Sequence, residues 1–164
     1  MNIRIAQRED VAQMLEIYND EVLNGTATFD LSPHTLSQRM AWFEAHNVDN
    51  HPLIVAEADG KVAGYASLST YREKEAYKST VELSIYVSRN FRRQGVASQL
   101  MQAILDLARR DENTYVVVSV ITEGNQASVN LHNRFGFTYC GTLHQVGRKF
   151  GRLLDVEMYE LNVQ

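Results

Sequence analysis

Cysteine is almost absent from this sequence, and the single one, Cys140, limits the chemistry that the chain can carry. One cysteine cannot form a disulfide within the chain, and it cannot build a cysteine-rich zinc site. At 164 residues the chain is long enough to bury a core without such cross-links. We therefore expect no metal, and we interpret Cys140 as a small residue beside a strand.

Positive charge is also scarce, because 16 Lys and Arg stand against 20 Asp and Glu, for a formal net charge of -4. A protein that follows a nucleic-acid backbone needs clustered Lys and Arg to displace counterions. No stretch approaches the ~20 apolar residues needed to cross a bilayer. The polar segment from Met1 to Glu9 lacks the apolar centre of a signal peptide. We expect no nucleic-acid or membrane partner, and a cytoplasmic location.

Breaks in the chain are few: there are only two prolines, no low-complexity tract and no repeat of fixed period. This continuity predicts a single domain over residues 1–164. Helical spacing of apolar residues predicts helices from Glu9 to Asn24, after Pro33, from Gly95 to Arg110 and over 128–135. Runs of strand-forming residues predict strands over 3–6, 53–58, 62–68, 81–87, 115–121, 137–142 and 155–161. This order predicts an α/β fold with helices on a central mixed sheet.

The strand from Val81 to Val87 leads into a sequence suited to binding an anion. Its odd-numbered aliphatic residues share one face, and Glu82, Ser84 and Tyr86 share the other. The first amides of the next helix have no internal partners, and the helix dipole makes that end partly positive. Small residues there let a pyrophosphate approach the backbone, and the segment reads Arg92-Arg93-Gln94-Gly95-Val96-Ala97-Ser98. A plain strand-to-helix turn that contains glycine is the alternative.

A second polar group follows on the helix over 128–135. Asn125, Ser128 and His132 fall on one helical face, while Leu131 and Phe135 lie on another. Three polar side chains in one row indicate a surface that faces a ligand. A histidine that is buried or merely exposed for structural reasons is the alternative reading of His132.

These two motifs resemble the GCN5-related N-acetyltransferase (GNAT) superfamily over essentially the whole chain. Arg92-x-x-Gly95-x-Ala97 resembles its acyl-CoA loop, and Asn125-x-x-Ser128-x-x-Leu131-His132 before Gly136-Phe137 resembles its next helix. Within the superfamily the closest resemblance is to the phosphinothricin and methionine sulfoximine N-acetyltransferases. Four further segments carry it, namely Tyr18-Asn19, Asn24 to Phe29, Thr80 to Val87, and Val146 to Asp155.

The resemblance implies a mixed, mostly antiparallel sheet flanked by helices, in which two strands splay apart to form a cleft for acetyl-CoA. Acetyl-CoA would donate an acetyl group to a small amino-acid-like amine of the phosphinothricin, methionine sulfoximine or methionine sulfone type. The residues that the resemblance assigns to acetyl-CoA are Ile85, Tyr86, Val87, Arg92, Arg93, Gln94, Gly95, Val96, Ala97, Ser98, Asn125, Ser128 and His132.

The resemblance also assigns catalytic roles. Glu82 matches the acid that the family places near the incoming amine, where a carboxylate can take the amine proton directly or through a water. The N–H of Val87 is a candidate donor to the oxyanion. Many members protonate the leaving thiolate with a Tyr at the position of His132, so this histidine either replaces the Tyr or only lines the channel. No covalent intermediate is required.

Five further residues are predicted to contact the acceptor amine or to shape its pocket. Tyr71, Arg72 and Tyr77 lie in the loop before Glu82, and Arg72 can form a paired contact with a substrate carboxylate. Phe29 and Lys149 are predicted to wall the pocket, across the interface of a homodimer. Two residues depart from the family pattern: Ala97 stands where Gly is common, and Leu153 stands where Trp is frequent.

Other functions stay open at this point. The acceptor can instead be a protein N-terminus, a lysine or a polyamine. A non-catalytic module that binds acyl-CoA would keep the same fold. A nucleotide-binding regulator has less support, since neither GxGxxG nor GxxxxGK[ST] occurs.

Overall fold

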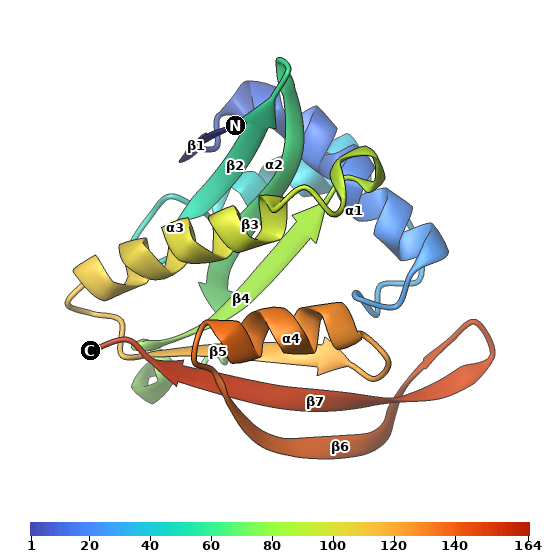
Figure 1. Ribbon diagram of the computed structural model, residues 1–164, viewed down its shortest axis with the longest axis vertical. Helices are drawn as coiled ribbons and strands as arrows, with labels where there is room; N and C mark the ends of the chain where they lie inside the picture. The colour runs from blue at the N-terminus through green and yellow to red at the C-terminus, as the bar shows by residue number, and fades with distance from the viewer.

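The computed structural model describes residues 1–164 and contains a seven-stranded sheet with helices on both faces (Figure 1). The strands are β1 (Asn2–Ile5), β2 (Leu53–Ala58), β3 (Lys61–Thr70), β4 (Thr80–Val87), β5 (Val116–Thr122), β6 (Thr138–Lys149) and β7 (Arg152–Asn162). The helices are α1 (Val11–Asn24), α2 (Leu36–Glu44), α3 (Val96–Arg110) and α4 (Gln126–Arg134). Three single turns of 3-10 helix, η1 (Arg8–Asp10), η2 (Glu75–Tyr77) and η3 (Arg89–Phe91), join these elements.

The strand order is β1-β2-β3-β4-β5-β7-β6. All neighbouring strands run antiparallel except β4 and β5, which are parallel. The predicted mixed, mostly antiparallel sheet flanked by helices is therefore confirmed.

The sheet splits between β4 and β5. These strands pair only from Thr80–Glu82 to Val116–Val118, although β4 pairs with β3 up to Val87 and β5 pairs with β7 up to Thr122. Beyond Glu82 the two halves of the sheet diverge, as the ribbons of β4 and β5 show in Figure 1. This divergence is the predicted splay.

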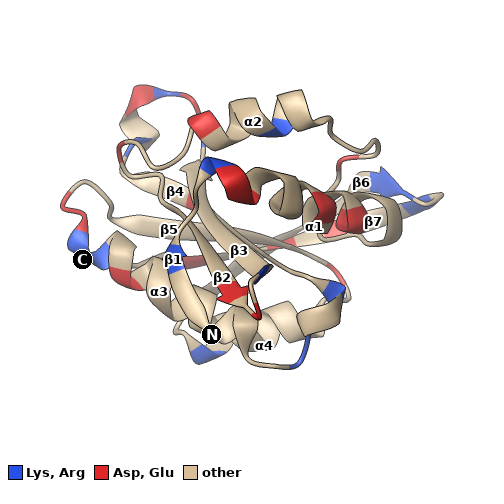
Figure 2. Cartoon of the chain, turned by 90° about the horizontal axis from the view of Figure 1, so that it is seen from above, with Lys and Arg blue, Asp and Glu red and all other residues tan.

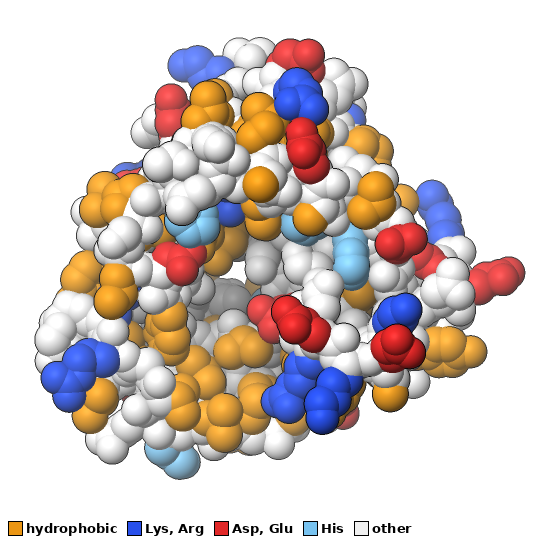
Figure 3. Space-filling view, turned by 180° about the vertical axis from the view of Figure 1, so that it is seen from behind, with side chains coloured by type: hydrophobic (Ala, Val, Ile, Leu, Met, Phe, Trp, Pro, Cys, Tyr) orange, Lys and Arg blue, Asp and Glu red, His pale blue; other side chains and the backbone are white.

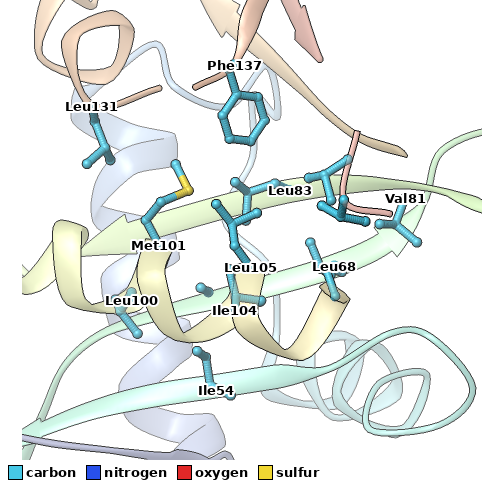
Figure 4. Packing of buried hydrophobic residues seen from close by; sticks show 14 of the residues in the cluster. Ile54, Leu68, Val81, Leu83, Leu100, Met101, Ile104, Leu105, Leu131 and Phe137 are labelled. Carbon is cyan, nitrogen blue, oxygen red and sulfur yellow. The ribbon is translucent and has the colours of Figure 1, made fainter. Parts of the chain in front are cut away.

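The larger core lies between the sheet and the helices α3 and α4. Its 19 buried residues include the α3 residues at spacing of four that the sequence predicts to face inward, Val96, Leu100, Ile104 and Ala108. In Figure 4, Met101 and Leu105 of α3 lie close to Leu83 of β4. This packing fixes the start of α3 beside β4.

The opposite face of the sheet is covered by α1 and α2 over a smaller core that includes Met14, Leu53 and Tyr65. A capping box starts α2: Thr35 Oγ1 accepts from Gln38 N (3.1 Å), and Gln38 Oε1 accepts from Thr35 N (2.8 Å). Because these side chains satisfy otherwise free amides, they set where α2 begins and which face it turns to the sheet.

The two cores confirm the predicted alternation along β4. Val81 and Leu83 belong to the larger core, whereas Tyr86 packs against the smaller one. Glu82 shares the face of Tyr86 and so points to the side of the sheet that carries α1 and α2.

The last two strands are longer than predicted. The sequence places them at 137–142 and 155–161, but β6 runs to Lys149 and β7 begins at Arg152, with two irregularities of register between them. The two strands project as a curved hairpin in Figure 1. Residues after Thr142 lack a clean alternation, and their strand conformation depends on pairing with β7.

Charged residues of both signs are spread over the helices, strands and loops (Figure 2). This distribution agrees with the small net charge of -4. None of the helices combines the length and the apolar character needed to span a bilayer.

Candidate active site

Two connected hollows meet where the sheet splits. A long cleft of about 1160 Å³ runs between β4 and β5 and past the first turns of α3 and α4. A side pocket of about 470 Å³ opens beside α1 and α2. Six residues line both hollows, which therefore join there: Ala27, Leu83, Ser84, Tyr86, Val120 and Thr122.

One edge of β4 faces the long cleft without a strand partner. The carbonyl of Ser79 accepts from Val116 N at the start of β5 (3.3 Å), and the amide of Ser88 donates to Ala63 O of β3 (2.8 Å). Because backbone groups of alternate residues point to opposite edges of a strand, those of Leu83, Ile85 and Val87 face the cleft. They are free to bind an extended ligand there, as predicted for Ile85 and Val87. The backbone of Tyr86 instead faces β3, and its side chain lines both hollows.

The start of α3 forms one end of the long cleft. Gly95 caps the helix with a left-handed backbone (φ 79°) and no side-chain cap. The first bond within the helix runs from Gln99 N to Gly95 O (3.1 Å), which leaves the amides of Val96, Ala97 and Ser98 for an anion. The other predicted residues of this loop, Arg92 and Arg93, also line the cleft, whereas Gln94 does not.

The wall opposite β4 carries Asn125 and Ser128. Asn125 caps α4, since its Oδ1 accepts from Ser128 N (3.2 Å). Both residues line the cleft. Arg134 adds a cationic side chain that reaches across from α4, and its Nη2 donates to Ser98 Oγ on α3 (3.0 Å).

His132 is only 5% exposed, and both of its ring nitrogens are engaged. Nδ1 lies 2.7 Å from the carbonyl oxygen of Ser128, and Nε2 lies 2.8 Å from Ser119 Oγ. A carbonyl can only accept, so Nδ1 carries the proton of the neutral ring and Nε2 accepts from the hydroxyl of Ser119. Burial lowers the pKa of His132 and favours that neutral form. In this state the ring has no free proton for a leaving group, and the role of His132 as general acid stays a prediction.

Glu82 lines the side pocket at the branch of the sheet. It is the last residue of β4 that pairs with β5. Its carboxylate makes no hydrogen bond or ion pair with the protein, and burial raises its pKa. A carboxyl with a raised pKa is a better proton acceptor near neutral pH than an ordinary one.

Phe29 and Lys149 lie close together but differ in access. Phe29 lines the side pocket, with its ring packed directly against the backbone of Gly147. Lys149 is 3% exposed, and its Nζ donates to the carbonyl oxygen of Thr28 (2.9 Å). It therefore supports the loop that carries Phe29 and lines neither hollow.

Tyr71, Arg72 and Tyr77 form a cluster of their own in the loop between β3 and β4. The Arg72 guanidinium lies 5.1 Å from the ring centre of Tyr71 and 5.9 Å from that of Tyr77. None of the three lines the long cleft or the side pocket. The loop follows β3 directly, but their contact with substrate stays a prediction.

The structure adds pocket residues that the sequence did not reveal. Arg39 and Trp42 of α2, together with Tyr18, Tyr65 and His34, line the side pocket. Seen from behind in Figure 3, this face of the molecule is hollowed near its centre, with histidine and acidic side chains at the edge. The sequence carries no local signal for Arg39, because Leu36, three residues before it, is itself exposed.

Comparisons with known proteins agree with this geometry. The Acetyltransferase (GNAT) family profile matches residues 11–137. An L-methionine sulfoximine/L-methionine sulfone acetyltransferase of Pseudomonas paraeruginosa is 43% identical over 99% of this chain and 94% of its own length. A phosphinothricin N-acetyltransferase of Streptomyces coelicolor is 36% identical over 98% of this chain and 95% of its own length.

The solved structures extend the agreement to three dimensions. A protein of Salmonella typhimurium, whose structure was determined with its cofactor acetyl-CoA, superposes with a TM-score of 0.96. It is 37% identical and covers 100% of this chain and 94% of its own. The resemblance inferred from the sequence is therefore confirmed, and the chain belongs to the GNAT family of acetyltransferases.

Proposed function

We propose that this chain transfers the acetyl group of acetyl-CoA to the amino group of a small amino acid or amino-acid analogue. The observation that carries the proposal is the unpaired carboxylate of Glu82, which lines the side pocket next to Leu83 and Ser84, where the pocket joins the long cleft. The names of the relatives support acceptors of the methionine sulfone, methionine sulfoximine and phosphinothricin type.

The residues of the long cleft suit acetyl-CoA, which supplies the acetyl group as a reactive thioester when it is bound. The free backbone groups of Ile85 and Val87 can bind an extended arm in the manner of an added strand. The amides of Val96 to Ser98 and the nearby arginines can hold phosphate groups. Asn125 and Ser128 close the cleft from the other side.

Glu82 has the position and the raised pKa that suit a general base. An ammonium group must lose a proton before its nitrogen becomes nucleophilic, and Glu82 can accept it directly or through a water. The N–H of Val87 faces the cleft and can donate to an oxygen on which negative charge develops. No step assigned to these residues requires a metal.

A homodimer is part of the proposal. Large apolar side chains of the β6–β7 hairpin are about half exposed, among them Val146, Phe150 and Leu153. A row of exposed apolar residues in a small protein is a common sign of an interface. Contacts of Tyr71, Arg72, Tyr77 and Lys149 with substrate, and a cytoplasmic location, stay predictions from the sequence.

An acceptor panel tests the proposal. Purified protein is given acetyl-CoA with L-methionine sulfone, phosphinothricin, spermidine or a short peptide with a free N-terminus, and release of CoA thiol is followed. We expect turnover with the amino-acid analogues and at least about 100-fold lower kcat/KM with spermidine and the peptide, as expected when a site is left with unpaired polar groups. Turnover of the peptide alone would contradict the acceptor class, and CoA binding without any turnover would indicate a non-catalytic module.

A further inference from the structure

The side pocket contains a second unpaired charge, the guanidinium of Arg39. This side chain is only 3% exposed. Its one hydrogen bond runs from Nη2 to the hydroxyl of Tyr65, and its Nε is buried without any partner. A guanidinium stays protonated in proteins, so Arg39 is a buried cation that lacks a matching anion.

The acidic residues of the pocket do not supply that anion. Asp30 is bound to the hydroxyl of Tyr18 and lies 3.0 Å from His34 Nε2. Glu82 makes no ion pair. No carboxylate oxygen of the protein lies within 4.0 Å of a guanidinium nitrogen of Arg39.

Aromatic rings hold the Arg39 guanidinium in place. Its central carbon lies 3.5 Å from the ring centre of Trp42, 4.3 Å from that of Tyr18 and 5.4 Å from that of Tyr65. Such contacts offset part of the cost of burying a charge, but they do not replace the hydrogen bonds that a guanidinium can donate to a carboxylate. The geometry thus fixes a cation beside the pocket and leaves its anion to come from outside.

One pocket holds both an unpaired cation and an unpaired carboxylate, which suits a ligand with a carboxylate and an ammonium group. Arg39 contacts the sheet at the hydroxyl of Tyr65, and Glu82 pairs with Ser69. The Cα atoms of Tyr65 and Ser69 are about 13 Å apart along an extended strand, and both Arg39 and Glu82 line the same pocket. Between them the floor is made by Ser67 and Ser84, which are paired and small.

We infer that Arg39 binds the carboxylate of the acceptor while Glu82 receives its ammonium group. The inference rests on the proposed function and deepens it, because it names the residue that selects amino acids. A polyamine has no carboxylate and would bring a second cation toward Arg39. A peptide N-terminus would place an uncharged amide where the carboxylate binds.

A pair of matched acceptors tests this role. L-methionine sulfone and its carboxamide differ only in the charged carboxylate, and kcat/KM for acetyl transfer is measured for both. Since a hydrogen-bonded charge pair is strong, we expect the wild type to prefer the acid about 10- to 100-fold. The ratio of the two kcat/KM values should fall to within about 3-fold in Arg39→Gln, because only the acid loses a charged partner. Arg39→Lys keeps the charge but loses the paired geometry, so its preference for the acid should lie between those of the wild type and Arg39→Gln.

The outcomes separate this inference from its rivals. If Arg39 only braces α2, both acceptors lose activity equally in Arg39→Gln and the preference is kept, which overturns the inference. If Arg72→Ala abolishes the preference while Arg39→Gln and Arg39→Lys keep it, Arg72 is the carboxylate site and the inference is wrong. A wild type that acetylates neither compound contradicts the proposed function itself.

Discussion

Burial favours the neutral forms of both Glu82 and His132, which means that their pKa values shift in opposite directions. Burial raises the pKa of Glu82, which has no partner. It lowers the pKa of His132, whose ring is held between Ser119 and the carbonyl of Ser128. The first residue is suited to accept a proton from a ligand, and the second is suited to orient the hydroxyl of Ser119 at the cleft.

His132→Gln tests the second assignment through stability. We expect a loss of about 1–3 kcal/mol in the free energy of unfolding at pH 7, because Ser119 and the Ser128 carbonyl lose well-placed partners in a buried site. Urea unfolding at pH 7 and pH 5 measures it.

The pH dependence of that loss has a definite sign. Because the pKa of folded His132 lies below that of the unfolded chain, acid favours the unfolded state, and the stabilisation falls as pH drops below the ordinary histidine value of ~6.5. The loss caused by the substitution should therefore be smaller at pH 5. An equal or larger loss at pH 5 would mean that His132 is charged in the folded protein. Burial also lowers the pKa of His46, but its contribution to the pH dependence is the same in the wild type and in His132→Gln and so cancels in the difference.

Alternation along one strand predicted the face of Glu82, and the family resemblance implied its place in the site, but neither pointed to Arg39. A lone arginine in an amphipathic helix is ordinarily read as solvated. It is buried here because Trp42, Tyr18 and Tyr65 come from three different elements to surround it. Likewise, the partner of His132 is Ser119 on β5, which no local spacing relates to it.

At the scale of elements, the turn into α3 depends on one backbone conformation. A side chain at Gly95 would meet no atom within 4 Å, so only its φ of 79° opposes substitution. Gly60, in the β2–β3 turn away from both hollows, has φ 73° and equally open space. The two glycines form a matched pair.

Gly95→Ala and Gly60→Ala should each destabilise the protein by about 1–2 kcal/mol, the cost of a left-handed L-residue. Thermal unfolding checks this. Only Gly95→Ala should also raise the KM for acetyl-CoA, by about 10-fold or more, because it shifts the amides that we propose bind the phosphates. An equal change of KM in both variants would show that the turn has no specific part in binding.

Helices and inner strands could be predicted from periodicity, since each buries a face that its own sequence marks. The hairpin of β6 and β7 could not be predicted at full length. The stretch from Leu143 to Lys149 is stabilised by pairing with the residues after Arg152, and this pairing contains an irregularity that removes the regular alternation. The two hollows likewise arise from packing between distant segments.

At the scale of the whole molecule, the hairpin presents apolar surface to solvent. Phe150 at its turn is 57% exposed. In a symmetric dimer the same contact occurs twice, so burying the exposed part of both Phe150 side chains would contribute roughly 2–3 kcal/mol in total, from ~1.5–3 kcal/mol for a fully exposed side chain.

We therefore expect Phe150→Asp to weaken the proposed dimer at least about 10-fold, a conservative share of that burial energy. Sedimentation velocity across a range of protein concentrations measures this. A wild type that stays monomeric at micromolar concentration would contradict the proposal.

The most direct test of the central claim, acetyl transfer to an amine with Glu82 as the base, is the pH dependence of kcat/KM in the wild type and in Glu82→Gln. Only the ionised carboxylate accepts a proton, so wild-type activity should fall as pH drops through the raised pKa of Glu82. In Glu82→Gln we expect kcat to fall about 10²- to 10⁴-fold, the usual contribution of a general base, with that pH dependence lost and CoA binding retained. A variant that keeps the wild-type rate and pH profile would contradict the account.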